Sequence, residues 1–215
     1  CVANSLIKDK NIWIMPNPGD SGSALGCIAN IQKKRLIWEG PYLGTEIKGE
    51  YPVEKIINEL INNKIVGVAN GRAEYGPRAL GNRSLLADPR GKYIKDEVNN
   101  IKKRQKFRPF APIILEEDVH EYFKMPVKRS PYMQFVGICK YPKEYPAIVH
   151  FDQTSRVQTV NENDHKGLYD LLLEWKDKTG CPMLLNTSLN IKGQPMVNTR
   201  LHADQFEQRY NVKVV

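Results

Sequence analysis

The spacing of apolar residues predicts one clear amphipathic helix at residues 53–61. Its apolar positions recur three and four residues apart, so they lie on one face of an α-helix. These positions are Val53, Ile56, Ile57, Leu60 and Ile61. Less regular patterns predict further helices at 20–32, 93–105, 168–175 and 202–210, the first and third of them marked by a capping residue or a final glycine.

Short apolar runs bounded by turn-forming residues predict strands at 12–15, 65–68, 110–115, 132–139, 156–160 and 182–185. Pro109 and Pro112 restrict the strand at 110–115 to a sheet edge or to a strand start, because proline lacks the amide hydrogen. Residues 33–51 are mixed and glycine-rich and are expected to form a linker. Because strands alternate with helices, the expected fold class is α/β or α+β.

The stretch GRAEYGPRALGNRSLLADPR, residues 71–90, directly follows the predicted strand at 65–68. It sets three arginines among three glycines: Arg72, Arg78 and Arg83 with Gly71, Gly76 and Gly81. Glycine lets backbone amides approach a ligand, and the arginine guanidinium matches the oxygens of a phosphate or carboxylate. The stretch therefore predicts a cradle for an anionic small molecule, with a solvated basic turn as the alternative.

Two further polar clusters lie just beyond predicted helix or strand ends, where sites of α/β proteins gather. The first is Lys102, Lys103, Arg104, Lys106 and Arg108; the second is Asn186, Thr187, Ser188 and Asn190, followed by Lys192 and Gly193. A solvated basic helix end and an Asn/Ser turn are the respective alternatives. A site of Arg, Lys, Ser and Asn works by positioning and charge stabilisation, as phosphoryl and nucleotidyl transfers do.

Histidine and cysteine give weaker signals. No Ser/His/Asp or Cys/His triad can be assembled from the four histidines. His150 precedes Asp152 and could orient a ligand, although a lone histidine is more often structural. The four cysteines (Cys1, Cys27, Cys139 and Cys181) are scattered, which argues against a zinc site or a disulfide framework and favours buried free thiols in a reducing cytoplasm.

Composition is that of a soluble globular protein. The 215 residues suit one domain and part of a second, and no apolar run approaches the roughly 18 residues that span a membrane. The start, CVANSLIKDK, lacks a signal peptide and an initiator methionine, so we expect a piece of a longer protein. The net charge of +8 fits an enzyme that binds anions or a protein that binds nucleic acid. The sequence lacks a basic motif interleaved with aromatic residues, which argues against nucleic acid.

Five segments together resemble one family. GRAEYGPRALGNRSLLADPR, IKKRQKFRPFAP, SPYM, FDQTSRVQTV and NTSLNIKGQPMV occur in this order and resemble the carboxyl-terminal half of the NodU/CmcH-type O-carbamoyltransferases. The resemblance implies an enzyme that uses carbamoyl phosphate and ATP to form carbamoyl-adenylate and then passes the carbamoyl group to a hydroxyl acceptor. It also implies two parts: an actin-like ATPase-type domain, and a domain similar to the YrdC-type threonylcarbamoyl-adenylate synthases.

The resemblance assigns roles to individual residues. Lys102 and Arg104 resemble the Lys-x-Arg of the YrdC fold, and Ser188 and Asn190 resemble its Ser-x-Asn; these four are the expected catalytic residues. The expected carbamoyl-phosphate and nucleotide contacts are Arg72, Arg78, Asn82, Arg83, Arg108, Asn186, Thr187 and Asn4. Asp20 resembles the last metal-ligand aspartate of the actin-like domain, although spacing alone would make it a turn or helix cap.

The resemblance further implies domain boundaries, cofactors and partners. Residues 1–35 would end the actin-like domain, 36–52 would be a linker, and 53–215 would form a YrdC-like twisted mixed sheet with flanking helices. The expected cofactors are ATP with Mg²⁺, and Fe²⁺ in an upstream domain; the expected partners are an unidentified hydroxyl acceptor, that upstream domain or a homodimer. A threonylcarbamoyl-adenylate synthase for tRNA modification and a non-catalytic basic RNA-binding remnant remain as alternatives.

Overall fold

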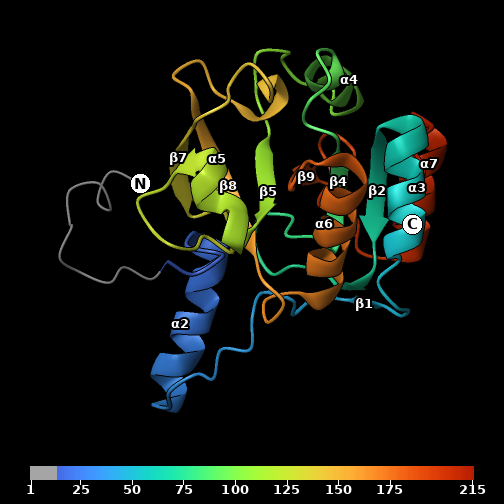
Figure 1. Cartoon of the computed structure of the whole chain (residues 1–215). Coiled ribbons are helices and arrows are strands. Elements are labelled where there is room, and N and C mark those ends of the chain that lie inside the picture. The colour runs from blue at the N-terminus through green and yellow to red at the C-terminus, as the bar shows by residue number, and fades with distance from the viewer. Residues whose placement is uncertain (1–13) are drawn as a thin grey trace.

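The fold is mixed α/β and is built on one twisted sheet (Figure 1). The computed structural model describes residues 14–215. The seven strands of the main sheet lie in the order β2-β4-β9-β5-β8-β7-β6. Their bounds are β2 (Ile65–Ala69), β4 (Arg83–Ala87), β5 (Ala111–Leu115), β6 (Phe123–Lys124), β7 (Phe135–Cys139), β8 (Thr154–Val160) and β9 (Met183–Ser188). β5 and β8 run parallel and the other neighbouring pairs run antiparallel, so the predicted mixed sheet with flanking helices is confirmed.

Helices pack on the sheet and leave the ends of its strands open to loops. They are α3 (Val53–Asn63), α4 (Ile94–Ile101), α5 (Val119–Tyr122), α6 (Lys166–Thr179) and α7 (Arg200–Tyr210), with the short 3-10 turns η1 (Glu116–Asp118) and η2 (Pro146–Ile148). α3 packs against β2 and α6, and α6 packs against β5 and β9. Ile56, Ile57 and Leu60 of α3 are fully buried, as their spacing predicts, whereas Ile61 is 45% exposed.

The amino-terminal helix α2 (Asp20–Gln32) has the predicted bounds and extends away from the sheet (Figure 1). The opposite end of the chain closes a sheet edge. Gly67 N donates to Lys213 O and Ala69 N donates to Val215 O, each at 2.8 Å. An edge strand with unpaired amides invites association with other chains, so this closing segment protects β2.

Residues 71–90, predicted as one glycine–arginine cradle, contain two strands. β3 (Gly71–Arg72) pairs with β1 (Glu46–Ile47), which lies in the expected linker. β4 lies between β2 and β9 and is buried along its whole length. It escaped prediction because it begins with Arg83 and Ser84, two polar residues that do not normally indicate a buried strand.

One strand prediction needs correction, and another holds in one of its two forms. β9 continues to Ser188, so residues 186–188 belong to a strand rather than to an Asn/Ser turn. Of the two places that the prolines allowed for β5, a sheet edge or a strand start, the structure shows the second, because β5 lies inside the sheet between β9 and β8. Pro112 is accommodated near the strand start, because the ladder to β8 begins only at Ile113. Of the predicted strand at 12–15, Ile14 and Met15 have no regular structure and the rest lies outside the described residues.

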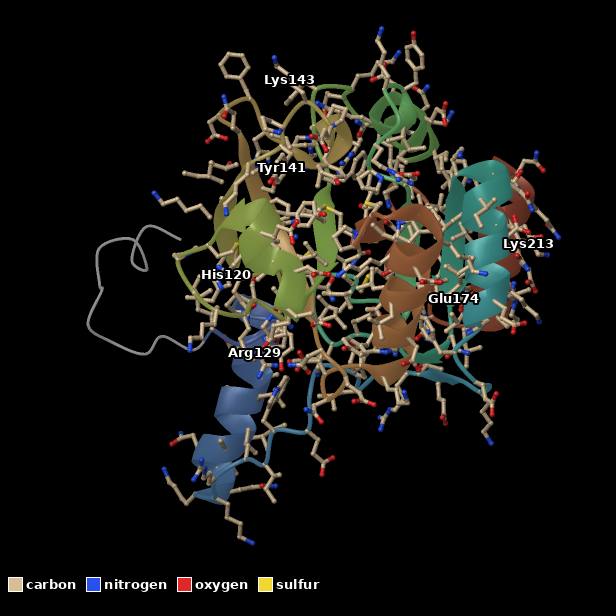
Figure 2. All side chains as sticks on the ribbon, viewed as in Figure 1. His120, Arg129, Tyr141, Lys143, Glu174 and Lys213 are labelled. Atoms are coloured by element: carbon tan, nitrogen blue, oxygen red, sulfur yellow. The ribbon has the colours of Figure 1, made fainter. Side chains whose placement is uncertain are left out.

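The surface agrees in part with the composition. Charged side chains lie at the surface, among them Glu174 of α6 and Lys213, which follows α7 (Figure 2). Cys139 and Cys181 are buried free thiols, as expected, but Cys27 is exposed, because α2 stands away from the sheet. In the part of the chain that the structure describes, no helix is both long and apolar enough to cross a membrane.

Candidate functional site

Lys102 joins two polar clusters that lie 86 residues apart in the sequence. It follows α4, and its Nζ donates to Ser188 O at 2.6 Å and to Ser188 Oγ at 3.3 Å. The amine also donates to Asn190 O at 3.4 Å and to Asn190 Oδ1. Ser188 Oγ in turn donates to Asn190 Oδ1 at 2.8 Å. Three of the four predicted catalytic residues therefore form one hydrogen-bonded unit.

Arg104, the fourth, is fixed by the loop between α4 and β5. Its Nη2 donates to Pro109 O at 3.2 Å and its Nε donates to Asn99 Oδ1. The guanidinium carbon lies 4.0 Å from the centroid of the Phe110 ring, which adds a cation–π contact. These contacts hold the guanidinium in place and leave part of it facing open space.

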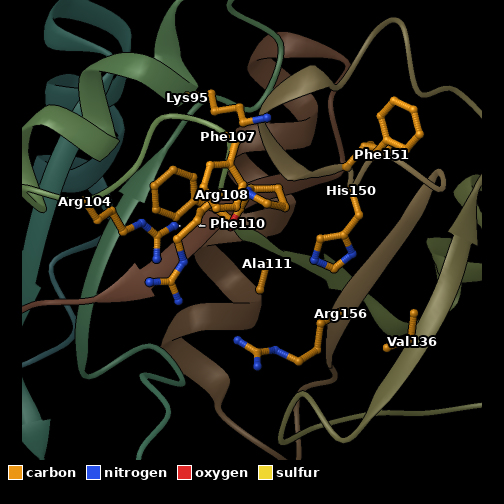
Figure 3. A pocket seen from close by; sticks show the side chains of 12 residues that line it. Lys95, Arg104, Phe107, Arg108, Phe110, Ala111, Val136, His150, Phe151 and Arg156 are labelled. Carbon is orange, nitrogen blue, oxygen red and sulfur yellow. Dashed lines mark hydrogen bonds between the residues drawn. The ribbon is translucent and has the colours of Figure 1, made fainter. Parts of the chain in front are cut away.

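Two hollows adjoin this unit, and Arg104 and Arg108 line both of them. The first has a volume of about 620 Å³, and its polar lining is Lys95, Arg104, Arg108, His150 and Arg156. Figure 3 shows the side chains of Arg108, His150 and Arg156 around this space. The second, of about 550 Å³, is lined by Lys102, Lys103, Arg104, Gln105, Arg108, Asn190, Lys192 and Gly193. We call the two hollows together the basic cleft.

The basic cleft concentrates positive charge. Burial, followed by the charges of Arg78 and Arg108, lowers the pKa of Arg156 to about 10. Burial, followed by Arg108 and Arg156, likewise lowers the pKa of Arg104 to about 10. Among the described residues, no carboxylate lines either hollow. Such unbalanced repulsion is relieved when an anion binds, so the geometry suits a phosphate or another polyanion.

Lys102 is also perturbed. Burial, with a smaller contribution from Arg104, lowers the pKa of Lys102 to about 7. The surrounding oxygens of Ser188 and Asn190 act in the opposite direction, because they accept hydrogen bonds from the ammonium form. A bound anion beside the amine would strengthen this preference for the charged form.

The loop that carries Arg78 is fixed by a buried carboxylate. Glu74 is 6% exposed, and its Oε1 accepts three backbone hydrogen bonds. The donors are the amides of Leu80, Asn82 and Arg83, at 2.7, 2.8 and 3.1 Å. Arg78 lies within this loop and is close enough to Arg156 to depress its pKa. Glu74 therefore shapes the backbone that carries Arg78 near Arg156, although Arg78, predicted as a ligand contact, lines neither hollow.

Two tyrosines from the segment before α3 hold the same loop from the other side. Tyr42 OH donates to Leu80 O at 3.1 Å, and Tyr51 OH donates to Gly81 O at 3.0 Å. Burial is the main cause that raises the pKa of both hydroxyls, which keeps them protonated as donors. The segment expected to be a linker is thus part of the support for the site.

Arg72 and Arg83, predicted as ligand contacts, are bonded to the protein's own backbone instead. Arg83 is fully buried, and its guanidinium donates to five carbonyl oxygens, those of Thr45, Asn70, Gly71, Asn82 and Asn198. Arg72 donates to Leu43 O at 2.8 Å and to Gly44 O at 3.2 Å. Both arginines tie loops together, and Arg83 has no surface left for a ligand.

Three predicted amide or hydroxyl contacts lie behind the cleft. Asn82 Nδ2 donates to Arg72 O, and its Oδ1 lies 2.7 Å from His165 Nε2. Asn186 is buried in β9, and its Nδ2 donates to Ala79 O and to Gln158 Oε1. Thr187 pairs with Leu85 of β4 and does not line the basic cleft. The Asn186 side chain holds the Arg78 loop through Ala79 O, and the Asn82 side chain holds it through Arg72 O.

The amino-terminal predictions stay predictions. Asn4 lies outside the described residues, and Asp20 is the first residue of α2, with a side chain that is also outside the description. Arg156 was missed as a site residue, although it lies in the motif FDQTSRVQTV. The feature that marks Arg156 as a site residue is its place in a strand between two buried residues, since Ser155 and Val157 are both 0% exposed.

Comparison with known proteins agrees with this geometry. Residues 57–215 match the model of the family described as "Carbamoyltransferase C-terminus". This match covers well over half of the chain. The chain belongs to this family.

Curated relatives of this family member include two nodulation proteins. Nodulation protein NolO of Bradyrhizobium diazoefficiens is 36% identical over 88% of the chain and 40% of the relative. Nodulation protein U of Sinorhizobium fredii is 36% identical over 86% of the chain and 36% of the relative. The chain thus spans between a third and two fifths of the length of these relatives.

The fold has a counterpart among solved structures. Full-length HypF, in a phosphate- and nucleotide-bound form, matches with a TM-score of 0.51 at 18% identity, over 76% of this chain and 20% of HypF. At this identity the likeness concerns the fold. It confirms that the sheet and its helices form an arrangement that also occurs within a larger protein.

Proposed function

We propose that this chain is the part of an O-carbamoyltransferase that binds carbamoyl phosphate and ATP and forms carbamoyl-adenylate. The observation that carries the proposal is the basic cleft, in which Lys102, Arg104, Arg108 and Arg156 surround open space and no carboxylate of residues 14–215 lines either hollow. Family membership supports a carbamoyl-transfer role. The phosphate and nucleotide bound by HypF, which shares the fold, are consistent with this pair of substrates.

The proposed chemistry rests on charge stabilisation. Both substrates are polyanions, and joining a carbamate oxygen to the α-phosphorus of ATP expels pyrophosphate. Fixed guanidinium groups stabilise the charge that accumulates on these oxygens. Arg104 is held by Asn99, Pro109 and Phe110, so it needs no rearrangement when the charge develops.

The metal is expected to arrive with the nucleotide. In residues 14–215, no group of three His, Cys, Asp or Glu side chains is arranged to hold a metal ion. Mg²⁺ commonly binds through nucleotide phosphates and water with few protein ligands, and the cleft's Arg and Lys donors suit the phosphates rather than the ion. Transfer to a hydroxyl acceptor is proposed to need parts of the enzyme beyond this chain, as the greater length of the relatives suggests.

The test is carbamoyl-phosphate-dependent release of pyrophosphate from ATP. We expect Arg104→Ala and Ser188→Ala to lower kcat/KM by about 100-fold or more. Arg104→Ala removes a fixed donor of the cleft, and Ser188→Ala removes a hydroxyl that holds Lys102 and Asn190 in place. Arg209→Ala is the matched control, since Arg209 lies in the last turn of α7 and lines neither hollow. Equal rates in all four proteins would contradict the proposed site. Release that depends on threonine and bicarbonate would instead favour threonylcarbamoyl-adenylate synthesis.

A further inference from the structure

His150 belongs to a small hydrogen-bonded turn at the edge of the basic cleft. His150 N donates to Thr154 O at 2.8 Å, and Gln153 N donates to His150 O at 3.0 Å. Asp152 Oδ1 accepts from Thr154 N at 3.0 Å. The turn leads directly into β8, which carries Arg156 two residues after Thr154. The imidazole and the Arg156 guanidinium therefore reach the first hollow from one continuous segment (Figure 3).

The turn also fixes which nitrogen of the ring carries hydrogen. Thr154 Oγ1 lies 2.7 Å from Asp152 Oδ1 and 2.9 Å from His150 Nδ1. Hydrogen bonds from Thr154 lower the pKa of Asp152, so this carboxylate is ionised and can only accept. The one hydroxyl hydrogen of Thr154 then goes to Asp152, and His150 Nδ1 must donate to Thr154 Oγ1. In the neutral ring this leaves the lone pair on Nε2, which has no hydrogen-bond partner among residues 14–215.

His150 differs chemically from everything else that lines the first hollow. The other polar side chains there are Lys95, Arg104, Arg108 and Arg156, all of which are hydrogen-bond donors only. The rest of the lining is apolar. Among the described residues that line this hollow, His150 is thus the one whose side chain carries a nitrogen lone pair that can accept a proton.

The proposed reaction requires such a proton acceptor. Release of both phosphate and pyrophosphate from carbamoyl phosphate and ATP consumes one water molecule, because the phosphate that leaves must gain an oxygen. Attack by that water forms a new P–O bond and breaks the bond between phosphorus and the carbamate oxygen. Carbamate leaves with the electron pair, and the water loses one proton: carbamoyl phosphate(2−) and water give carbamate(1−), hydrogen phosphate(2−) and one proton.

Resting on the proposed function, we propose that His150 is the general base for this step. Its Nε2 accepts the proton from the water that attacks carbamoyl phosphate, while Arg108 and Arg156 hold the phosphate oxygens. Thr154 and Asp152 are positioning residues, which keep hydrogen on Nδ1 and the lone pair toward the hollow. The carbamate then attacks ATP in a step that moves no proton, so His150 serves only the first half of the reaction.

The experiment separates the two halves. Phosphate release from carbamoyl phosphate is measured beside pyrophosphate formation from ATP with carbamate supplied directly by ammonium bicarbonate. We expect His150→Gln to slow phosphate release by about 100-fold or more and to leave carbamate-dependent pyrophosphate formation within about threefold of the wild-type rate. In His150→Ala, added imidazole restores phosphate release. His120→Gln is the matched control, because His120 lies on α5 and lines neither hollow (Figure 2).

Each outcome bears on the assignment. Phosphate release at the wild-type rate in His150→Gln overturns it, and so does an equal loss in both assays, which would indicate a purely structural residue. Thr154→Val keeps the ring but frees Nδ1, so it should slow phosphate release alone and respond to imidazole less than His150→Ala does. A wild-type chain that forms no pyrophosphate from either carbamoyl source overturns the proposed function, and the assignment with it.

Discussion

Glu74 shows how one buried side chain can determine the shape of a loop. Its Oε1 accepts hydrogen bonds from three backbone amides, while its Oε2 is buried and has no hydrogen-bond partner in the described part of the chain. Burial raises the pKa of this carboxyl, although the three amides act in the opposite direction. Burying a carboxylate costs free energy, and the three hydrogen bonds from backbone amides offset part of that cost.

We predict that Glu74→Ala destabilises the chain and disturbs the Arg78 loop. Three buried amides would lose their acceptor, which costs about 3 kcal/mol or more in the free energy of unfolding. Glu74→Gln keeps a side-chain oxygen for these amides and should recover most of the loss. Urea unfolding measures the stability, and kcat/KM for pyrophosphate release measures the positioning. An alanine variant equal to wild type in both would contradict this role.

Arg83 and Arg156 show why residue type alone does not identify a ligand contact. Both are arginines in strands, yet Arg83 gives its guanidinium to five carbonyl oxygens and Arg156 faces the basic cleft. The sequence analysis assigned the first to the ligand and overlooked the second. Each has the same donors, and only the neighbouring oxygens in the fold distinguish a tie between loops from an anion contact.

At the scale of elements, the start of α6 is linked to the Arg78 loop through His165. Its Nδ1 accepts from Leu168 N at 3.1 Å and so caps the helix. Its Nε2 donates to Asn82 Oδ1 at 2.7 Å, because the Asn82 amide nitrogen already donates to Arg72 O. Burial lowers the pKa of His165 to about 4, so the neutral ring keeps both bonds at ordinary pH.

This arrangement predicts a loss of stability in mild acid. The unfolded chain binds a proton at the ordinary histidine pKa of about 6.5, whereas the folded chain resists protonation until about pH 4. Between these values the free energy of unfolding should fall by up to about 1.4 kcal/mol for each pH unit. Urea unfolding at pH 6.5, 5.5 and 4.5 measures the slope. His165→Asn keeps a capping side chain but cannot titrate, so it should give a shallower slope; parallel slopes would contradict the assignment.

Periodicity predicted the elements whose burial follows side-chain polarity. α3 was found close to its observed bounds, and Leu168 and Trp175 mark the buried face of α6. α2 and α7 were also found close to their bounds but without a regular buried face, since Ile31 of α2 is 80% exposed and Leu201 of α7 is 64% exposed. β4 and the end of β9 were missed because polar residues are buried there, in contacts with distant loops. The same reason limits prediction of the site. The hydrogen bond between Lys102 and Ser188 depends on the order of the strands in the sheet, and the local spacing of residues does not encode that order.

At the scale of the whole molecule, part of the net charge of +8 is concentrated in the basic cleft. Lysines and arginines occur over much of the surface, but those lining the basic cleft share the two hollows with no carboxylate from the part of the chain that the structure describes. The α4–β5 loop and the end of β9 meet through Lys102, and the Arg78 loop, which the two tyrosines before α3 hold, lies near Arg156. The fold therefore brings segments that are far apart in the sequence to the basic cleft or to its support.

The most direct test of this account is detection of carbamoyl-adenylate by mass spectrometry after the chain is mixed with ATP, Mg²⁺ and carbamoyl phosphate. We predict an adenylate that appears with one pyrophosphate and one phosphate per molecule, that requires carbamoyl phosphate, and that forms about 100-fold more slowly with Arg104→Ala. Wild-type chain that binds both substrates yet forms no adenylate, or that cleaves ATP equally well without carbamoyl phosphate, would contradict the account.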